Sequence, residues 1–470
     1  MPSSLDSFYK GGHMKGINTK IKAVWGVSEI GFSITATLET AFFIFFLTDV
    51  AQLPLAISGI IAGGASAVDI ISAAIAGVFI DKFHFKSGKY RPWLLYAPLC
   101  AMVFFILCFT KIGGDVTAGI IIAVGYIISH FFWNISYTAV RSLTNVLTDE
   151  PSERAFLSGR LGAGAALGRV CASQLVPWLT AALATLVSGV GAYTICAAIF
   201  SLIYIACMLI QFIVTKGYDT ETKTEASTVS FIAMGKNIIT NPNLIGVVLH
   251  DLLRLIAYYT VAAGTAYYAK VVIGDAAASG TILMVYYIGC FIGSFVAARV
   301  AKSIGTKNTT IIGVAGWLVL WVIAFFVQPD YIVLNILLFI SQVFFGFAYG
   351  LTVNLYSMCA TWSHWKTGEN TTGVTMSLMP VAVKVGVTLR AVILPAFLAF
   401  VGYDAAATTF DAAAQSGIFQ MYFLLPIALL VVSLIPLIFL FKIKDKDIEP
   451  MSDEINEREK AGVISESDAD

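Results

Sequence analysis

The feature that most constrains this chain is a series of long apolar runs, separated by short polar segments. A helix of about 20 apolar residues is long enough to cross the hydrocarbon core of a bilayer. Because 58% of the residues are hydrophobic and only 12% are charged, the chain has too few polar residues to cover several water-soluble domains. The pattern predicts an all-α integral membrane protein with about twelve transmembrane helices.

The longest interior polar stretch, 216–243, divides the apolar runs into two sets of equal number. The expected units are a cytoplasmic N-terminus at 1–22, a six-helix bundle at 23–215, a cytoplasmic linker at 216–243, a second six-helix bundle at 244–441 and a disordered cytoplasmic tail at 442–470. The loops after the second helix of each half are similar, since both end in a basic turn that contains glycine. Two related halves are typical of transporters built from internal repeats. Within the linker, 230–239 has the pattern of a short amphipathic surface helix or of a plain solvated segment.

Basic residues gather in alternate loops. Of the 29 lysines and arginines, four lie inside apolar runs, and Lys111 and Lys270 fall on one side of the membrane in this arrangement. The others fall on the opposite side. Cytoplasmic loops are enriched in Lys and Arg, so both termini are expected in the cytoplasm of a multi-pass protein of the cell inner (plasma) membrane.

Motifs for chemistry are missing from the sequence. There is no phosphate-binding loop signature, no zinc motif and no serine-nucleophile elbow. This argues against an ATP-driven pump and against an enzyme. We expect no cofactor, no bound metal and no nucleic-acid partner, and a monomer whose partners are a small solute and the lipid bilayer.

Several short motifs follow one another in a characteristic order. They are Thr48-Asp49-Val50, Asp69, Gly88-Lys89-Tyr90-Arg91-Pro92-Trp93, Ser142-Leu143, Glu153-Arg154, Val272-Ile273-Gly274-Asp275 and Val383-Lys384-Val385-Gly386. With them, the chain from about 22 to 442 resembles the melibiose carrier-like family of glycoside, pentoside and hexuronide:cation symporters in the major facilitator superfamily. The resemblance implies a pseudo-symmetric 6+6 bundle with a central cavity, alternating access, and solute uptake driven by sodium or protons.

The chain departs from that family at three positions. Similar members carry a second carboxylate one turn after Asp69, where this chain has Ala73. Two acids that grip the sugar in such carriers are replaced by Ser33 and Tyr137. The resemblance therefore implies neither a melibiose-like specificity nor a standard sodium site.

Eight ionisable side chains fall within the predicted spans. They are the acids Glu29, Glu39, Asp69 and Asp251 and the bases Arg169, Arg254, Lys384 and Arg390. Each charge inside a membrane costs at least about 2.5–3.5 kcal/mol on insertion scales, so each needs a partner or a function. Equal numbers of acids and bases permit pairing.

Asp69 is the strongest candidate for a cation-coupling site. It lies among small residues, and Ser72 follows on the same helix face. The resemblance places Asn134 and Lys384 beside it. Because a lysine ammonium near one carboxylate disfavours sodium, we predict that protons, or a fixed Asp69–Lys384 pair, replace the sodium site. A purely structural ion pair is the alternative.

Further side chains are candidates for binding the solute. They are Glu29, Phe32, Ser33, Glu39, Trp133, Tyr137, Arg169, Asp251, Arg254 and Arg390. Buried bases suit an anionic solute, because a guanidinium matches the two oxygens of a carboxylate. The three aromatic rings can stack on a sugar or can simply pack. Asp251 and Arg254 have the i,i+3 spacing of a pair, which fits substrate contact, gating or local charge pairing.

The loop residues Asp81, Lys82, Gly88, Lys89 and Arg91 suggest a cytoplasmic gate that holds the two halves closed. Membrane topology alone is the alternative explanation for the basic residues among them. The function predicted overall is cation-coupled symport of a sugar, glycoside or hexuronide, with proton or sodium as the coupling ion. A carrier of a non-sugar organic anion or amphipathic metabolite, and a non-transporting solute receptor, are the alternatives.

Overall fold

The computed structural model describes residues 17–460 except 84, 86, 149, 220–237, 329 and 408. Within that part of the chain, all the assigned elements of secondary structure are helices. Ten of the helices there are long and apolar enough to cross a membrane. The chain is thus an all-helical integral membrane protein, as the apolar runs predict.

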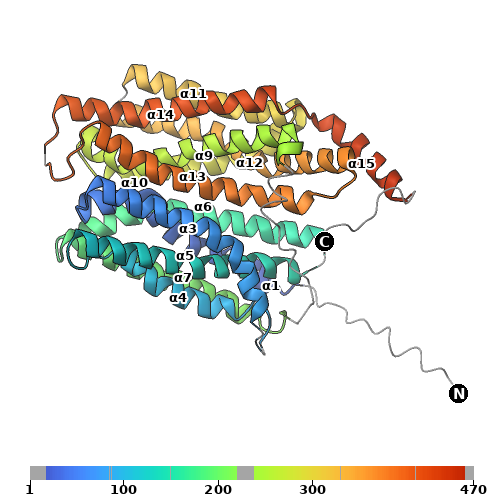
Figure 1. Cartoon of the computed structure of the whole chain (residues 1–470), viewed down its shortest axis with the longest axis horizontal. Helices are drawn as coiled ribbons and strands as arrows, with labels where there is room; N and C mark the ends of the chain where they lie inside the picture. Colours follow the sequence, from blue (N-terminus) through green and yellow to red (C-terminus); the bar gives the residue numbers. More distant parts are fainter. Residues whose placement is uncertain are drawn as a thin grey trace.

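One layer of the bundle consists of helices from the N-terminal part of the chain, which pack mainly on one another (Figure 1). We call it the N-terminal group. It comprises α2 (Val27–Phe45), α3 (Leu55–Lys82), α4 (Trp93–Cys108), α5 (Asp115–Val146), α6 (Pro151–Ala184) and α7 (Gly189–Val214). The short helix α1 (Thr19–Val24) precedes it.

The second layer contains the later helices, which we call the C-terminal group. It comprises α9 (Pro242–Tyr268), α10 (Ala278–Ile304), α11 (Thr306–Val327), α12 (Tyr331–Thr367), α13 (Thr372–Phe400) and α14 (Ala412–Phe439). Helix α15 (Asp445–Lys460) follows, at the same end of the bundle as α1 (Figure 1). We refer to this end as the terminal end, and to the other as the distal end.

The first helix of each group ends in a π-helical turn at the distal end. Helix α2 continues into η1 (Phe46–Val50), and α9 continues into η2 (Ala269–Ile273). Each turn carries one charged side chain, Asp49 in η1 and Lys270 in η2. Single π-helical turns are rare and occur frequently at functional sites.

A second shared feature lies after the second helix of each group. Gly88 (φ +118°) and Gly305 (φ +86°) adopt backbone conformations that favour glycine. Asp219, just after α7, accepts hydrogen bonds from the amides of Tyr90 and Arg91 at 2.7 and 2.6 Å. Asp445, just after α14, accepts one from the amide of Thr306 at 2.8 Å. The similarity between the two loops therefore extends to an aspartate that binds each glycine turn.

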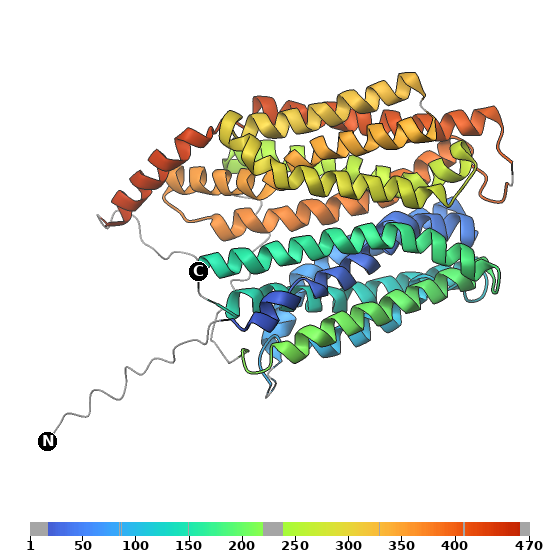
Figure 2. The same ribbon diagram turned by 180° about the vertical axis from the view of Figure 1, so that it is seen from behind.

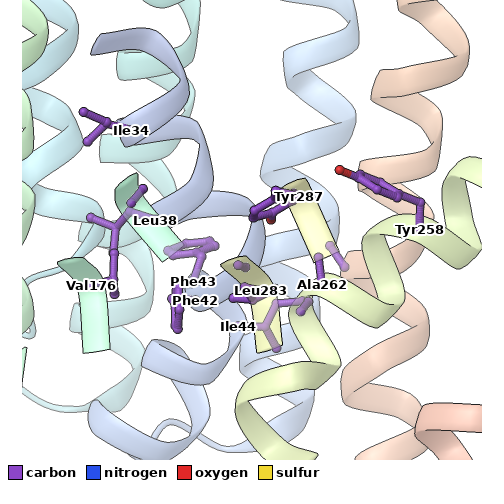
Figure 3. Close-up of a cluster of buried hydrophobic side chains, with 14 of the residues drawn as sticks. Ile34, Leu38, Phe42, Phe43, Ile44, Val176, Tyr258, Ala262, Leu283 and Tyr287 are labelled. Atoms are coloured by element: carbon purple, nitrogen blue, oxygen red, sulfur yellow. The ribbon is translucent and has the colours of Figure 1, made fainter. Parts of the chain in front are cut away.

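The two groups meet along α3 with α13, α6 with α10 and α2 with α9; Figure 2 shows α6 facing α10. A buried apolar cluster from α2, α6, α9 and α10 fills part of this interface, and includes Leu38, Val176, Ala262 and Leu283 (Figure 3). Helices α3 and α13 approach so closely that a Cβ on Gly63 of α3 would lie 2.5 Å from Cγ2 of Val392 on α13. Small residues permit this close packing between membrane helices.

The prediction of a disordered tail is wrong for residues 445–460, which form α15. Its polar face is fixed to the end of α12: the indole of Trp365 donates to Glu454 at 2.7 Å, and Arg458 donates to the Trp365 carbonyl at 2.9 Å. The helix also carries a short apolar stripe, since Ile448, Met451 and Ile455 have i, i+3, i+7 spacing, which the prediction of disorder overlooked. Ile455 is buried, and Ile448 packs against the apolar cluster that includes the end of α12. Residues 461–470, and the segment 230–237 of the expected surface helix, lie outside the described residues.

Candidate transport site

Four polar side chains predicted to form the coupling site lie together in the structure. Lys384 Nζ on α13 lies 2.5 Å from Oδ2 of Asp69 on α3. The Asn134 amide on α5 donates to Asp69 Oδ1 at 2.6 Å, and its oxygen accepts from Lys384 at 3.1 Å. Ser72 Oγ lies 3.2 Å from Asp69 Oδ1. The cluster thus joins two helices of the N-terminal group to one of the C-terminal group.

Other titratable groups face this cluster. His130 on α5 interacts electrostatically with Asp69, Glu39 and Lys384. Its Nδ1 lies 2.9 Å from the carbonyl oxygen of Tyr126, and its ring stacks on the Tyr126 ring with centroids 3.7 Å apart. His130 is therefore held in place by α5 itself.

A second connection between the groups involves Glu39 on α2 and Arg390 on α13. Arg390 Nη2 lies 3.8 Å from Glu39 Oε1, and Nη1 donates to the carbonyl of Thr40. The Tyr126 hydroxyl also donates to Glu39, at 3.2 Å. The Nε atom of Arg390 is buried without a hydrogen-bond partner among the described residues. The Nε–H of Arg390 is therefore still able to donate.

Asp251 and Arg254, in contrast, pair within the C-terminal group. They form an ion pair on α9, and both side chains are only 2% exposed. Two residues of α12 complete the cluster: Thr352 accepts from Arg254 at 2.6 Å, and Tyr356 donates to Asp251 at 3.2 Å. This geometry is that of local charge pairing, one of the alternatives for this motif.

The first acid, Glu29, pairs with an arginine that the sequence analysis did not place inside a span. Arg141 Nη2, on α5, lies 2.8 Å from Glu29 Oε1 on α2. The prediction of four acids matched by four bases is therefore incomplete, because α5 continues past Arg141 to Val146. Arg169 on α6 is left without an ion pair among the described residues, and its electrostatic neighbours include Tyr258, Tyr259 and Tyr349.

The candidate aromatic residues also gather here. The Phe32 ring lies with its centroid 4.9 Å from that of Trp133 and 5.0 Å from that of Tyr137. Trp133 is 5% exposed, and its Nε1 has no hydrogen-bond partner among the described residues. Ser33 is buried where α2 approaches Gly168 of α6. Phe32 and Tyr137 are half-buried, so they retain accessible ring surface.

The described contacts of the predicted gate residues lie within the N-terminal group. Arg91 stacks on Phe212 of α7 with its Cζ 3.8 Å from the ring centroid, and its Nε donates to the Phe212 carbonyl at 2.8 Å. Lys89 lies over the ring of Tyr90, and Lys82 is exposed at the end of α3. The side chain of Asp81 lies outside the described part of the chain. In this conformation the loop is anchored to its own group, and its role as a gate stays a prediction.

Sequence reasoning missed a cluster at the distal end. Lys270 Nζ lies 2.6 Å from Asp49 Oδ1, the Tyr403 hydroxyl donates to the same oxygen at 2.5 Å, and the hydroxyls of Thr48 and Tyr267 lie 2.7 Å apart. These contacts join the N-terminal group to α9, η2 and the segment after α13. Asp49 and the segment 272–275 belong to motifs that the sequence analysis noted. The sequence analysis did not predict which residues they contact.

A membrane-embedded helical bundle whose two layers share buried charge pairs is typical of membrane transport proteins. Residues 24–445 match the family model for MFS/sugar transport proteins, MFS being the major facilitator superfamily. The chain belongs to this family of major facilitator transporters. It is therefore a transport protein and not an enzyme.

Several relatives align along nearly the whole chain. A putative sulfoquinovose importer of Escherichia coli (strain K12) is 24% identical over 96% of each chain. The isoprimeverose transporter of Lactiplantibacillus pentosus is 25% identical, over 91% of this chain and 88% of the transporter. A glucuronide carrier protein homolog of Escherichia coli (strain K12) is 24% identical, over 93% of this chain and 95% of the homolog.

Solved structures share the fold. The D-xylose-proton symporter superposes with a TM-score of 0.63 at 13% identity, covering 88% of this chain and 96% of the symporter. The nucleoside transporter NupG superposes with a TM-score of 0.61 at 14% identity, covering 89% of this chain and 99% of NupG. At this identity the likeness establishes the fold alone.

Proposed function

We propose that the chain is a cation-coupled symporter of a sugar-derived solute that works by alternating access, with the proton as coupling ion. The observation that carries the proposal is the Asp69–Lys384 pair, with 2.5 Å between carboxylate and ammonium, because it joins the two groups at their interface. In alternating access two bundles rock against each other around a fixed site. An ion that changes this contact changes the balance between the two conformations.

The Asp69 cluster favours a proton over sodium. Sodium would need several oxygen ligands, whereas one carboxylate oxygen of Asp69 is occupied by the Lys384 ammonium and the other by the Asn134 amide. A proton on Asp69 neutralises the carboxylate and removes its attraction for Lys384. The N-terminal and C-terminal groups are then freer to separate, which links proton binding to the conformational change.

The solute is inferred from the charges and from the relatives. Sulfoquinovose and glucuronides are sugars with an acidic group, and two relatives carry these solutes in their names. Arg169, without an ion pair among the described residues, leaves one positive charge for such a group. The aromatic cluster of Phe32, Trp133 and Tyr137 provides ring surface for the sugar. A non-sugar organic anion is the second candidate, since the same positive charge favours it.

We also propose how the protein lies in the membrane. Helix α4 is 16 residues long, and α6 contains charged residues along its 34 residues. Both pack alongside the ten apolar helices, so we count them as spans, which makes twelve in a 6+6 arrangement. The terminal end is placed in the cytoplasm by the positive-inside rule. Among the described residues, the ion pair that joins the two groups at an end of the bundle, Asp49–Lys270, lies at the distal end. Because the distal end is proposed to face the outside, we infer that this conformation is closed toward the outside.

Proteoliposomes that contain the purified protein test the proposal. Uptake of radiolabelled methyl glucuronide and methyl glucoside is measured at several pH values, with and without a sodium gradient. We expect uptake to follow an inward proton gradient and to be insensitive to sodium. The Asp69→Asn variant should still exchange solute in counterflow but should not accumulate it against a gradient. Strict sodium dependence would contradict proton coupling, and binding without counterflow would identify a receptor.

A further inference from the structure

The site around Glu29 contains more positive than negative charge. Glu29 on α2 is 5% exposed, and its partner Arg141 on α5 is 45% exposed, so the ion pair is accessible only from the arginine side. Glu29 also interacts electrostatically with Arg169 on α6. One carboxylate and two guanidinium groups leave one positive charge uncompensated.

The same space is bordered by the opposite group. Tyr349 of α12 is 38% exposed and interacts electrostatically with Arg141, Arg169 and Tyr137. The Arg141 guanidinium lies over the Tyr137 ring, with Cζ 4.8 Å from the centroid. Residues of α2, α5 and α12 therefore surround Arg141, and Arg169 of α6 shares Glu29 and Tyr349 with it as electrostatic neighbours.

We propose that Arg141 and Arg169 form the subsite for the acidic group of the solute, and that Glu29 is the counter-ion of Arg141 while the subsite is empty. The inference rests on the proposed function and specifies its substrate class. When a solute anion takes the exposed N–H groups of Arg141, Glu29 retains Arg169 as a neighbour of opposite charge. One solute charge then makes the subsite neutral, which favours a monoanionic sugar derivative, because uncompensated charge inside a membrane protein is costly.

The net charge of the subsite gives distinct predictions for its variants. Arg141→Gln makes the empty subsite neutral, so it should discriminate against the anion. Changing Glu29→Gln as well restores one positive charge, so the double variant should recover part of the affinity for the anion. A residue that only supports the fold would not be rescued in this way.

Counterflow in proteoliposomes of the full-length protein provides the measurement. The probes are methyl glucoside (neutral), methyl glucuronide (one carboxylate) and the 6-sulfonate of methyl glucoside. We expect Arg141→Gln to raise the half-saturation concentration of both anions about tenfold or more, since hydrogen bonds to charged groups are the strong ones, and to change that of the glucoside little. The Glu29→Gln, Arg141→Gln double variant should lie between this single variant and the wild type.

Two further variants separate charge from folding. Arg141→Lys keeps the charge and loses the planar fork, so it should bind the anions better than Arg141→Gln does. Arg458→Gln removes an arginine from an ion pair in α15, outside the bundle, and should transport as the wild type does. If Arg141→Gln and the wild type exchange the anions with equal half-saturation, the subsite inference is wrong while the proposed function stands. If the wild type exchanges none of the three probes, the proposed function is wrong and the inference falls with it.

Discussion

The individual charged residues of this protein are best understood as pairs. Asp69 and Lys384 lie 2.5 Å apart on opposite groups, with side chains 11% and 23% exposed. Removing one partner of a buried pair leaves an unpaired charge, whereas removing both can be nearly neutral. The pair therefore contributes to the contact between the groups mainly through this penalty.

A double-mutant cycle measures that coupling. We expect Asp69→Asn and Lys384→Gln each to destabilise the protein by about 1–3 kcal/mol, less than for a fully buried pair because Lys384 is partly exposed. The double variant should recover most of the loss. Thermal unfolding of the purified protein in detergent gives the comparison. If the losses of the single variants simply add in the double variant, the two side chains are not coupled.

At the level of helices, the π-helical turns η1 and η2 carry the distal contact between the groups. Asp49 is 2% exposed and accepts from both Lys270 and Tyr403, so the contact links η1 to η2 and to the segment after α13. Equivalent helices of the two groups thus meet through oppositely charged turns. Neutralising the carboxylate should weaken the contact without changing the size of the side chain.

We expect Asp49→Asn to increase the population that is open at the distal end. Spin labels on Leu186→Cys and Gln415→Cys, in the exposed distal segments of the two groups, report the separation when Cys100 is replaced by Ser. Pulsed electron paramagnetic resonance should detect the longer distance between the labels in a several-fold larger fraction of the molecules. A change of about 1.4 kcal/mol in the free-energy difference between the two conformations changes their ratio tenfold.

A control for this measurement lies at the same end of the molecule. Asp115→Asn removes the partner of Lys111, 3.0 Å away, but this pair lies within the N-terminal group. It should leave the label distances unchanged. An equal response to both variants would mean that loss of distal charge, rather than the contact between groups, shifts the conformation.

For the whole molecule, the orientation that we propose rests on the positive-inside rule and on which basic residues lie at the end opposite α1 and α15. Lys111 and Lys270, predicted to lie opposite the other loop bases, are both at the distal end, where Lys111 donates to the Ala51 carbonyl at 2.6 Å. The structure therefore places these two lysines together, at the end opposite α1 and α15. Each span reverses the direction of the chain. Lys111 follows the third helix of the N-terminal group and Lys270 follows the first helix of the C-terminal group, so both follow an odd number of spans and lie at the same end.

Labelling of intact cells with a membrane-impermeant maleimide tests this orientation. Each substitution is made in the Cys100→Ser background, since that cysteine is exposed. Asp275→Cys, in an exposed distal turn, should react from outside. Lys446→Cys, in α15, should react only after the membrane is permeabilised. The reverse pattern would place the termini outside the cell and contradict the positive-inside argument.

The sequence by itself determined the membrane environment, the helical class and the identity of most charges inside the bundle. These follow from the length and composition of apolar runs, which are local properties of the chain. The motifs also brought Asp69, Asn134 and Lys384 to one site, through the resemblance to a family. Local composition did not reveal α15, because its stability comes from contacts with α12.

Only the tertiary structure decided which charge meets which. It paired Glu29 with Arg141, left Arg169 without an ion pair among the described residues, and joined Asp49 to Lys270 across the two groups. The pattern of one helix shows which residues share a face, but not how that helix is rotated against its neighbours. Pairing between helices far apart in sequence depends on those rotations, so it appears only when the bundle is assembled.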